Sequence, residues 1–217
     1  MTLENRVRPD GVLEAVSVRG MFTGNRGIVH DPGGRKPNGR RWTTKAWICC
    51  SLSWKGGKRD VWGRNHVRRD GTPGIGWSEL FFLDEVTALA AGHRPCHACR
   101  REEAVAFRSA FCTLHGLGGT RDIDEILHGE RWLSARTAPQ ALSAIDLPGL
   151  PDGAMVEAGG AFFALRNRMA LPWSHAGYGA PLGLGLLARQ PVRLVTPKSV
   201  LGVFRQGYLP AWHPSAA

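Results

Sequence analysis

Residues 81–100 read FFLDEVTALAAGHRPCHACR, and this stretch decides how the chain is expected to fold. Its first three residues suit the end of a buried strand, and Asp84 suits the N-cap of a short helix. Gly92 is placed to end that helix, because glycine readily adopts the left-handed conformation. Pro95 then favours an extended chain. The stretch therefore predicts a strand, a short helix and an extended approach to the residues that follow.

That approach leads into Cys96 and Cys99, which are separated by two residues. This spacing lets two thiolates bind one ion from a single turn, as in many zinc sites. The chain has five cysteines, an odd number, which in a reducing compartment favours metal binding over disulfides. A tetrahedral zinc site needs two more ligands.

The run from Ala91 to Arg100, with the apolar strand and the acidic helix start before it, resembles part of a known domain. It is similar to the second half of the zinc-binding domain of Ada-type DNA alkylation-repair proteins, and to a related module at the ends of some nucleases. The resemblance covers about residues 46–111. In that family, a cysteine pair at the end of an earlier strand completes the site, and one of its cysteines can accept a methyl group from a DNA phosphotriester.

The positions that correspond to this earlier pair are Cys49 and Cys50, which are adjacent, whereas the family's pair is spaced by three residues. Both lie on a predicted strand over residues 43–54, and alternation along a strand directs them to opposite faces. Cys50 shares the apolar face, next to the core. Cys49 shares the more polar face, where an accessible or reactive thiol is expected. We therefore favour Cys50 as a ligand and keep Cys49 as the alternative.

The fourth ligand stays open among His66, His30, His97 and the other thiol of the doublet. Three cysteines and one histidine are a common set in structural zinc sites. His66 lies in a loop and is free to reach the ion, although a loop histidine is more often a surface residue. The fifth cysteine, Cys112, follows an apolar position of an amphipathic helix and is expected to be a buried or half-buried free thiol.

The formal net charge of +10 is the second strong signal. Such an excess attracts polyanions, and arginine, which predominates among the basic residues, suits phosphate groups. We therefore expect nucleic acid as the partner, DNA in preference to RNA. The expected contacts come from two basic clusters and from a loop over residues 171–179 that could stack on a base. They are Arg40, Arg41, Arg64, Arg68, Arg69, Trp173 and Tyr178.

The apolar runs are short and interrupted by Gly, Pro and Arg, so no membrane span is expected. Glu4, Arg6 and Arg8 stand where a signal peptide would be apolar. We expect a cytoplasmic protein without a membrane partner. The sequence gives no indication of the oligomeric state.

The predicted fold class is α+β, with a zinc-stabilised β-hairpin plus helices and then a smaller C-terminal segment of β-hairpin and helix. A short strand is predicted over residues 26–30, after a turn signal at Gly24 and Asn25. The expected organisation is in three parts, the last of which packs either separately or into one domain with the first. They are an Ada-like zinc-binding domain at 1–134, a linker or wrapping loop at 135–153, and a β-rich segment at 154–217 with a hairpin turn at Gly159 and Gly160.

The sequence favours a zinc-containing nucleic-acid-binding protein of DNA repair or DNA processing, with Zn²⁺ as its cofactor. One alternative is a DNA-modifying enzyme. It would use either an alkyl-accepting zinc thiolate at Cys49 or Cys50, or nuclease or glycosylase chemistry in the loop at 171–179. A zinc-bound thiolate stays deprotonated and nucleophilic, which supports alkyl transfer. The sequence lacks paired carboxylates and a phosphate-cradling glycine loop, so hydrolysis has little support. A second alternative is a zinc-stabilised scaffold for protein partners.

Overall fold

The computed structural model describes residues 3–31, 33–54, 57–58, 64, 66–134 and 141–217. The fold is α+β, as the sequence predicts. Within this part of the chain, the strands form a six-stranded sheet, a seven-stranded sheet and two short two-stranded hairpins. Among the described residues, no helix combines the length and the apolar character needed to cross a membrane.

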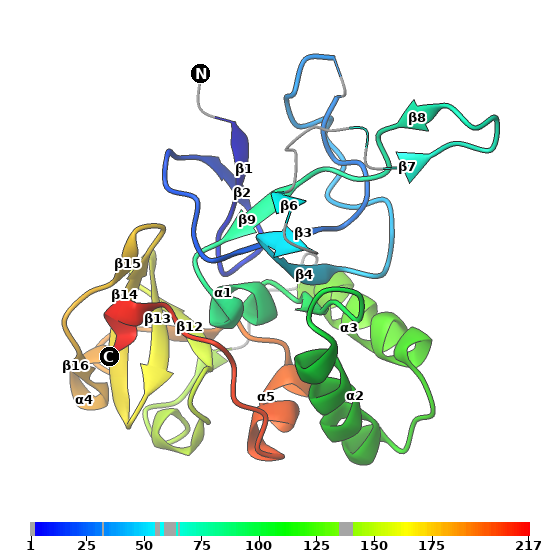
Figure 1. The fold of residues 1–217 in the computed structure, drawn as a ribbon. Helices are drawn as coiled ribbons and strands as arrows, with labels where there is room; N and C mark the ends of the chain where they lie inside the picture. Colours follow the sequence, from blue (N-terminus) through cyan, green and yellow to red (C-terminus); the bar gives the residue numbers. More distant parts are fainter. Residues whose placement is uncertain (1–2, 32, 55–56, 59–63, 65, 135–140) are drawn as a thin grey trace.

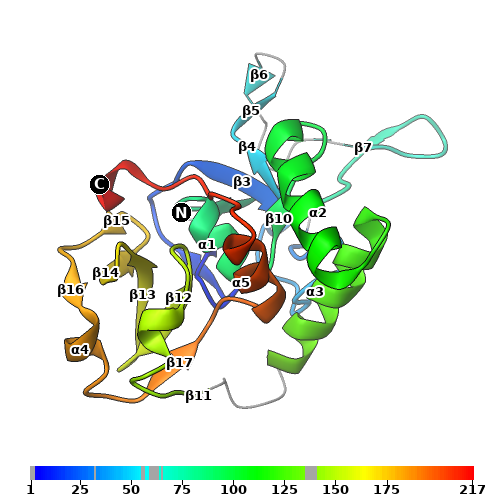
Figure 2. The ribbon, with the colours of Figure 1, turned by 90° about the horizontal axis from the view of Figure 1, so that it is seen from below.

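The six-stranded sheet has the order β10-β4-β3-β9-β1-β2. Its pairs are antiparallel except β1 with β9 and β10 with β4, which are parallel. The two hairpins, β5–β6 and β7–β8, project from the body of the molecule (Figure 1, Figure 2). The strands of this part are β1 (Glu4–Val7), β2 (Leu13–Ala15), β3 (Phe22–Asn25), β4 (Ile48–Ser51), β5 (Ser53–Trp54), β6 (Gly57–Lys58), β7 (His66–Val67), β8 (Pro73–Gly74), β9 (Leu80–Phe82) and β10 (Arg94–Pro95).

Strand β3 lies earlier in the chain than the strand predicted at residues 26–30, so that prediction is wrong. Gly24 is a central strand residue that pairs with Cys49 on one side and with Leu80 on the other. A Cβ atom at this position would lie 2.1 Å from the carbonyl oxygen of Ile48. Glycine is therefore needed here for close approach of the next strand, and does not mark a turn.

Local signals mark both ends of α1 and the end of α2. Asp84 accepts a hydrogen bond from the Thr87 N–H at 2.9 Å and caps α1. Gly92, which follows α1, and Gly116, which ends α2, have φ angles of 81° and 64°. The α-helices are α1 (Glu85–Ala90), α2 (Arg101–His115), α3 (Thr120–Ser134), α4 (Leu184–Leu187) and α5 (Lys198–Arg205), and the 3₁₀ turns are Leu147–Gly149 and Pro214–Ala216.

The seven-stranded sheet has the order β11-β17-β12-β13-β14-β15, and β16 pairs with β14. The hairpin predicted around Gly159 and Gly160 is confirmed as β12–β13. Residues 171–179 were predicted as a loop, but most of them belong to the β14–β15 hairpin. The strands are β11 (Ala141–Leu142), β12 (Met155–Ala158), β13 (Ala161–Arg166), β14 (Met169–Ser174), β15 (Gly177–Tyr178), β16 (Leu182–Gly183) and β17 (Val192–Leu194).

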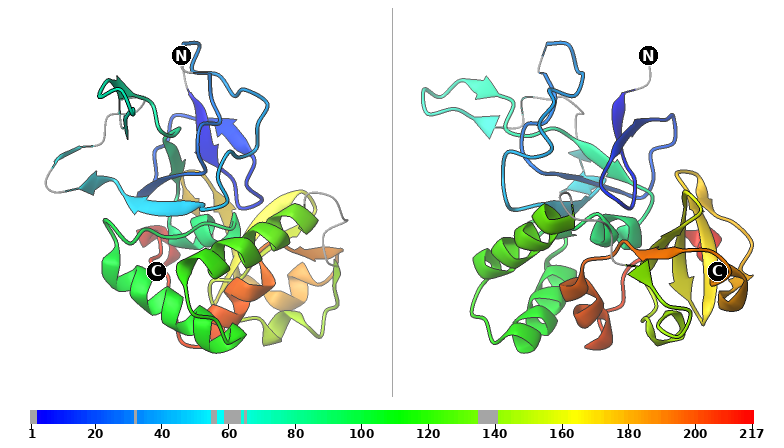
Figure 3. Two further views of the ribbon diagram at one scale, coloured as in Figure 1. Left: turned by 90° about the vertical axis from the view of Figure 1, so that its right-hand side faces the viewer. Right: turned by 180° about the vertical axis from the view of Figure 1, so that it is seen from behind.

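Helix α1 lies between the two sheets, and all six of its residues are buried (Figure 1, Figure 3). Ala88 packs with Val7 and other residues of the six-stranded sheet. Val86 packs with Met155 and other residues of the seven-stranded sheet. Leu89 belongs to a third cluster, which also contains buried residues of α2, α3 and α5. The helix predicted from residues 84–92 is thus the element on which both sheets pack, while the predicted domain boundaries stay a prediction.

Candidate metal centre

The pairing of β10 with β4 places cysteines from distant parts of the sequence side by side. The two strands run in parallel, with Pro95 opposite Cys49, and the Cys96 N–H donates to the Cys49 carbonyl at 2.9 Å. Parallel strands advance together, so the next residues, Cys50 and Cys96, lie beside each other. The turn that follows brings Cys99 back to the same point, with the Arg100 N–H on the Cys96 carbonyl at 2.9 Å.

The sulfur atoms of Cys50, Cys96 and Cys99 all lie within 4.8 Å of one another. In a tetrahedral zinc site with Zn–S bonds of about 2.3 Å, the sulfurs are about 3.8 Å apart, so this spacing fits a metal ion. Thiolate ligands suit zinc, copper(I) and iron. Among the residues that the structure describes, no fourth cysteine, histidine or carboxylate joins the group. The chain thus brings together three cysteines that could hold a metal ion.

Hydrogen bonds within the group separate the acidities of its thiols. Bonds to Cys96 and Cys99 raise the pKa of the Cys50 thiol, and the bond from Cys50 lowers the pKa of Cys99. Cys99 is also the most exposed member, because Cys50 and Cys96 are buried and Cys99 is half-buried. The thiol of Cys99 therefore loses its proton more readily than that of Cys50, and it is the most exposed of the three.

Cys49, the alternative ligand, lies outside this group. Its side chain is 0% exposed and packs in the apolar cluster of the six-stranded sheet with Leu80 and Ala88. Arg100 Nη1 donates to its sulfur at 3.6 Å, and burial raises the pKa of the thiol. The expectation of an accessible thiol at Cys49 is wrong, because α1 covers the face of β4 that alternation alone marks as polar.

The histidines considered as fourth ligands also lie outside the group. His66 is exposed on strand β7 of a projecting hairpin. His30 is buried, with Nε2 at 2.8 Å from the Glu4 carbonyl oxygen. His97 lies between Cys96 and Cys99, whose turn we call the cysteine knuckle, with Nε2 at 3.4 Å from Thr120 Oγ1. The remaining thiol, Cys112, is half-buried against an apolar cluster, as predicted.

A buried polar network supports the start of α2 beside the three cysteines. Arg100 Nη1 forms an ion pair with Glu85 Oε1 at 2.9 Å, and both side chains are almost completely buried. The Tyr208 hydroxyl donates to the same carboxylate at 2.6 Å, and the Ala211 N–H donates to its other oxygen at 2.9 Å. The residue after Cys99 is thus fixed to α1 and to the C-terminal segment.

Basic side chains surround His97. Burial lowers the pKa of His97, and the charges of Arg94, Arg108 and Arg101 lower it further. Arg94 is paired with Asp124 through two bonds of 2.7 and 2.8 Å, whereas Arg101 and Arg108 are exposed on α2. Arg101 and Arg108 are not among the phosphate contacts predicted from the sequence. The sequence contained a signal for them, because residues seven positions apart lie on the same face of a helix, and this helix begins just after Cys99.

The residues predicted to contact nucleic acid fall into two groups. The five arginines are all exposed, with Arg68 and Arg69 at the end of the β7–β8 hairpin. Trp173 and Tyr178 instead face α1 and its N-cap. Tyr178 is 8% exposed, and its hydroxyl donates to Asp84 Oδ2 at 2.8 Å. Trp173 is half-buried, and its Nε1 donates to Thr87 Oγ1 at 3.0 Å.

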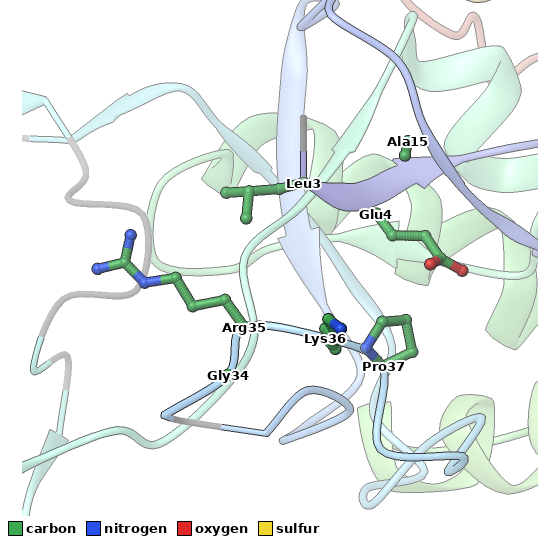
Figure 4. A pocket seen from close by; sticks show the side chains of 7 residues that line it. All are labelled: Leu3, Glu4, Ala15, Gly34, Arg35, Lys36 and Pro37. Atoms are coloured by element: carbon green, nitrogen blue, oxygen red, sulfur yellow. The ribbon is translucent and has the colours of Figure 1, made fainter. Parts of the chain in front are cut away.

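A hollow of about 660 Å³ lies at the start of β1, and none of the three cysteines lines it (Figure 4). Its lining carries two cations, Arg35 and Lys36, and one carboxylate, Glu4. None of the predicted site residues belongs to this lining. The residues that line it are Leu3, Glu4, Ala15, Gly34, Arg35, Lys36 and Pro37.

No protein family, curated protein or solved structure matches this chain. The resemblance to Ada-type domains stays a prediction that rests on the residue pattern around Cys96 and Cys99. Function therefore has to be inferred from the three thiols and the residues around them.

Proposed function

We propose that the protein binds zinc through Cys50, Cys96 and Cys99 and binds nucleic acid, with a role in DNA repair or DNA processing. The convergence of three thiols, one from β4 and two from the segment after β10, carries this proposal. Zinc suits such a set because it prefers thiolates in tetrahedral geometry. The ion would link β4 to the segment just before α2. This link would add to the hydrogen bonds that already join β4 to β10.

The net charge and the position of the arginines support nucleic acid as the partner. The chain carries +10, and exposed arginines occur both beside the cysteines and on the β7–β8 hairpin. The charges of Arg101 and Arg108 act on His97, which lies between Cys96 and Cys99, and both arginines are exposed on α2. A phosphate backbone passing over these two arginines would be held by charge-assisted hydrogen bonds.

Metal analysis of purified protein tests the first half of the proposal. We expect about one zinc ion per chain in the wild type, following tetrahedral cysteine sites in general. Cys96→Ser should lose most of the metal, whereas Cys112→Ser should keep it, because Cys112 lies outside the group. A wild type without stoichiometric metal, or equal zinc in both variants, would exclude the site. If the purified protein contains iron instead of zinc, the three-cysteine site is supported and the metal is iron.

Binding to duplex DNA, single-stranded DNA and RNA over a salt series tests the second half. Each phosphate contact contributes about 0.9 to the slope of log affinity against log salt on duplex DNA, so Arg101→Gln with Arg108→Gln should lower the slope by about 1.8. The control pair is Arg168→Gln with Arg189→Gln, which removes the same charge from exposed positions elsewhere. If both double variants lower the slope equally, Arg101 and Arg108 make no specific phosphate contacts and only the net charge of the protein matters.

The exposure of Cys99 favours a second candidate function, in which its sulfur accepts a methyl group from a DNA phosphotriester. A carbon–sulfur bond forms and the carbon–oxygen bond of the ester breaks. The electron pair stays on the phosphate oxygen, which becomes a diester anion, and the thiolate becomes a neutral thioether. Intact mass spectrometry after exposure to methylated DNA should show one added methyl group in the wild type and none in Cys99→Ser. An unchanged wild-type mass would exclude this function without affecting the zinc site.

A further inference from the structure

Arg26 carries a charge that the described residues do not neutralise. Its side chain is 1% exposed and lies over the Trp47 ring, with its guanidinium carbon 4.7 Å from the ring centroid. Nη2 donates to the Gly11 carbonyl at 2.9 Å. Nε and Nη1 are buried and have no hydrogen-bond partner in the part of the chain that the structure describes. Buried donors without a partner are rare, and a buried charge without a counter-ion is strongly unfavourable.

A second arginine approaches the same point. A Cβ atom on Gly11, where φ is 83°, would lie 3.6 Å from Arg26 Nη1 and 3.4 Å from Arg41 Nη2. The missing side chain of Gly11 therefore leaves a notch between two guanidinium groups. Arg41 is exposed, whereas Arg26 lies at the buried side of the notch.

The charges around this notch are predominantly positive. Arg131 lies over the Trp47 ring as well, at 4.3 Å. The pKa of Arg26 is lowered to about 9, first by burial and then by the charges of Arg41 and Arg131. Asp10 is the acidic neighbour that opposes this effect, but its carboxylate is already paired with Arg8 at 2.7 Å. An anion in the notch would supply the missing counter-charge.

We propose that Arg26 and Arg41 form a binding site for a phosphate group at the Gly11 notch. Two guanidinium groups provide planar, charge-assisted donors that match phosphate oxygens. The buried arginine is held in place by its bond to Gly11 and by the Trp47 ring, so it is pre-organised for the anion. Arg41, which comes from an exposed loop, closes on the ligand from the solvent side. The site is separate from the three cysteines and goes beyond the proposed function, because it does not depend on metal.

Calorimetry and thermal unfolding with inorganic phosphate and pyrophosphate, at constant ionic strength set by chloride, test the site. We expect saturable binding and a rise in the melting temperature of the wild type. Arg41→Gln should weaken binding at least tenfold. Arg40→Gln is the matched control, because it removes the same charge from the adjacent exposed residue, and it should bind like the wild type. Equal binding by the two variants, or no saturation in the wild type, overturns the proposal for the free anions.

The same pair of variants identifies the source of the phosphate group. A short duplex DNA replaces the free anion in the second arm of the experiment. A loss in Arg41→Gln that is at least tenfold larger than in Arg40→Gln supports a backbone phosphate at this site, even when the free anions do not bind. Specific loss with the free anions alone supports a small phosphorylated ligand. A specific loss in neither arm overturns the proposal.

Arg26→Met separates an anion site from a purely structural arginine. If Arg26 serves the anion, the variant should be at least as stable as the wild type in chloride, because an uncompensated buried charge has been removed. It should also lose the stabilisation by phosphate. If Arg26 is structural, its replacement lowers the melting temperature by the same amount at every phosphate concentration, and the proposal fails. If Arg26→Met does not fold, the decision rests on Arg41→Gln, which changes an exposed residue.

Discussion

His93 is buried near Arg26 and Arg131, and these surroundings disfavour a positive charge on its ring. Its ring is 0% exposed and contacts the rings of Trp47 and Phe82, at centroid distances of 5.0 and 4.7 Å. Burial lowers its pKa well below the ordinary value of 6.5, and the charges of Arg26 and Arg131 lower it further. The imidazole is therefore neutral in the folded protein over the physiological range.

We expect this neutral histidine to make folding stability depend on pH. Because the folded-state pKa is lowered, the contribution is fully present above about pH 6.5 and is lost as the pH falls from there towards the folded-state pKa. The loss approaches about 1.4 kcal/mol per pH unit. His93→Phe keeps an aromatic ring but cannot titrate, so its unfolding free energy should fall less steeply between pH 6.5 and 5. Urea denaturation at several pH values gives both slopes, and equal slopes would contradict the prediction.

For single residues, the sequence predicted which cysteines lie together, but it did not predict the burial and the neighbours of each thiol. Spacing alone predicted the pairing of Cys96 with Cys99, and alternation selected Cys50 in preference to Cys49. The burial of Cys49 depends on α1, which packs on its strand from 35 or more positions further along the chain. The sequence indicated Arg41 as a phosphate contact but did not connect it with Gly11 and Arg26, because these residues come together only through the folded chain.

At the scale of elements, the chain direction after α1 depends on Gly92. This residue has a φ of 81°, and a Cβ atom on it would lie 2.7 Å from Cδ and 2.8 Å from Cγ of Arg131. Arg131 Nη1 also donates to the Gly92 carbonyl. The glycine thus allows both the left-handed turn and the close approach of α3 to the segment that enters the cysteine knuckle.

Gly92→Ala should therefore destabilise the fold more than the same change at another helix end. Gly116 ends α2 with a φ of 64°, and a Cβ atom on it would have no neighbour within 4 Å among the described residues. Alanine there should cost about 1 kcal/mol, from the left-handed backbone alone. At Gly92 the clash with Arg131 adds to this, for a total of about 2 to 3 kcal/mol. Denaturant unfolding of the two variants measures the difference, and equal losses would contradict the role of the contact.

Helix α1 was predictable because its ends carry local signals, whereas the strand predicted at 26–30 and the loop predicted at 171–179 failed for non-local reasons. Asp84 and Gly92 mark boundaries that the structure confirms. Gly24 looked like a turn residue, yet its neighbours across the sheet require a glycine inside a strand. Likewise, Trp173 and Tyr178 looked like an open aromatic loop, but they pair with each other in a hairpin that packs towards α1.

At the scale of the whole molecule, Glu85 connects segments from three parts of the chain. It belongs to α1, pairs with Arg100 at the start of α2, and accepts hydrogen bonds from Tyr208 and Ala211 near the C-terminal end. Its side chain and that of Arg100 are 1% and 3% exposed. Removal of the carboxylate charge would leave a buried guanidinium without its main partner.

Glu85→Gln should lower the unfolding free energy by about 3 kcal/mol, because breaking one side of a buried ion pair leaves an uncompensated charge. Glu103→Gln is the matched control, since Glu103 pairs with the same Arg100 at 3.3 Å but is 45% exposed. Its loss should stay below about 1 kcal/mol. Urea denaturation compares the two. Similar losses of unfolding free energy in the two variants would contradict a special contribution of the buried Glu85–Arg100 pair.

The burial of α1 between the two sheets has a consequence for how the protein opens. Neither sheet can separate from the other without uncovering this helix, so its amide hydrogens should exchange with deuterium only through global unfolding. The amides of the β7–β8 hairpin, whose residues His66 and Val67 are exposed, should exchange early. We therefore expect the β7–β8 hairpin to open in local fluctuations, whereas the two sheets unfold together in one cooperative transition.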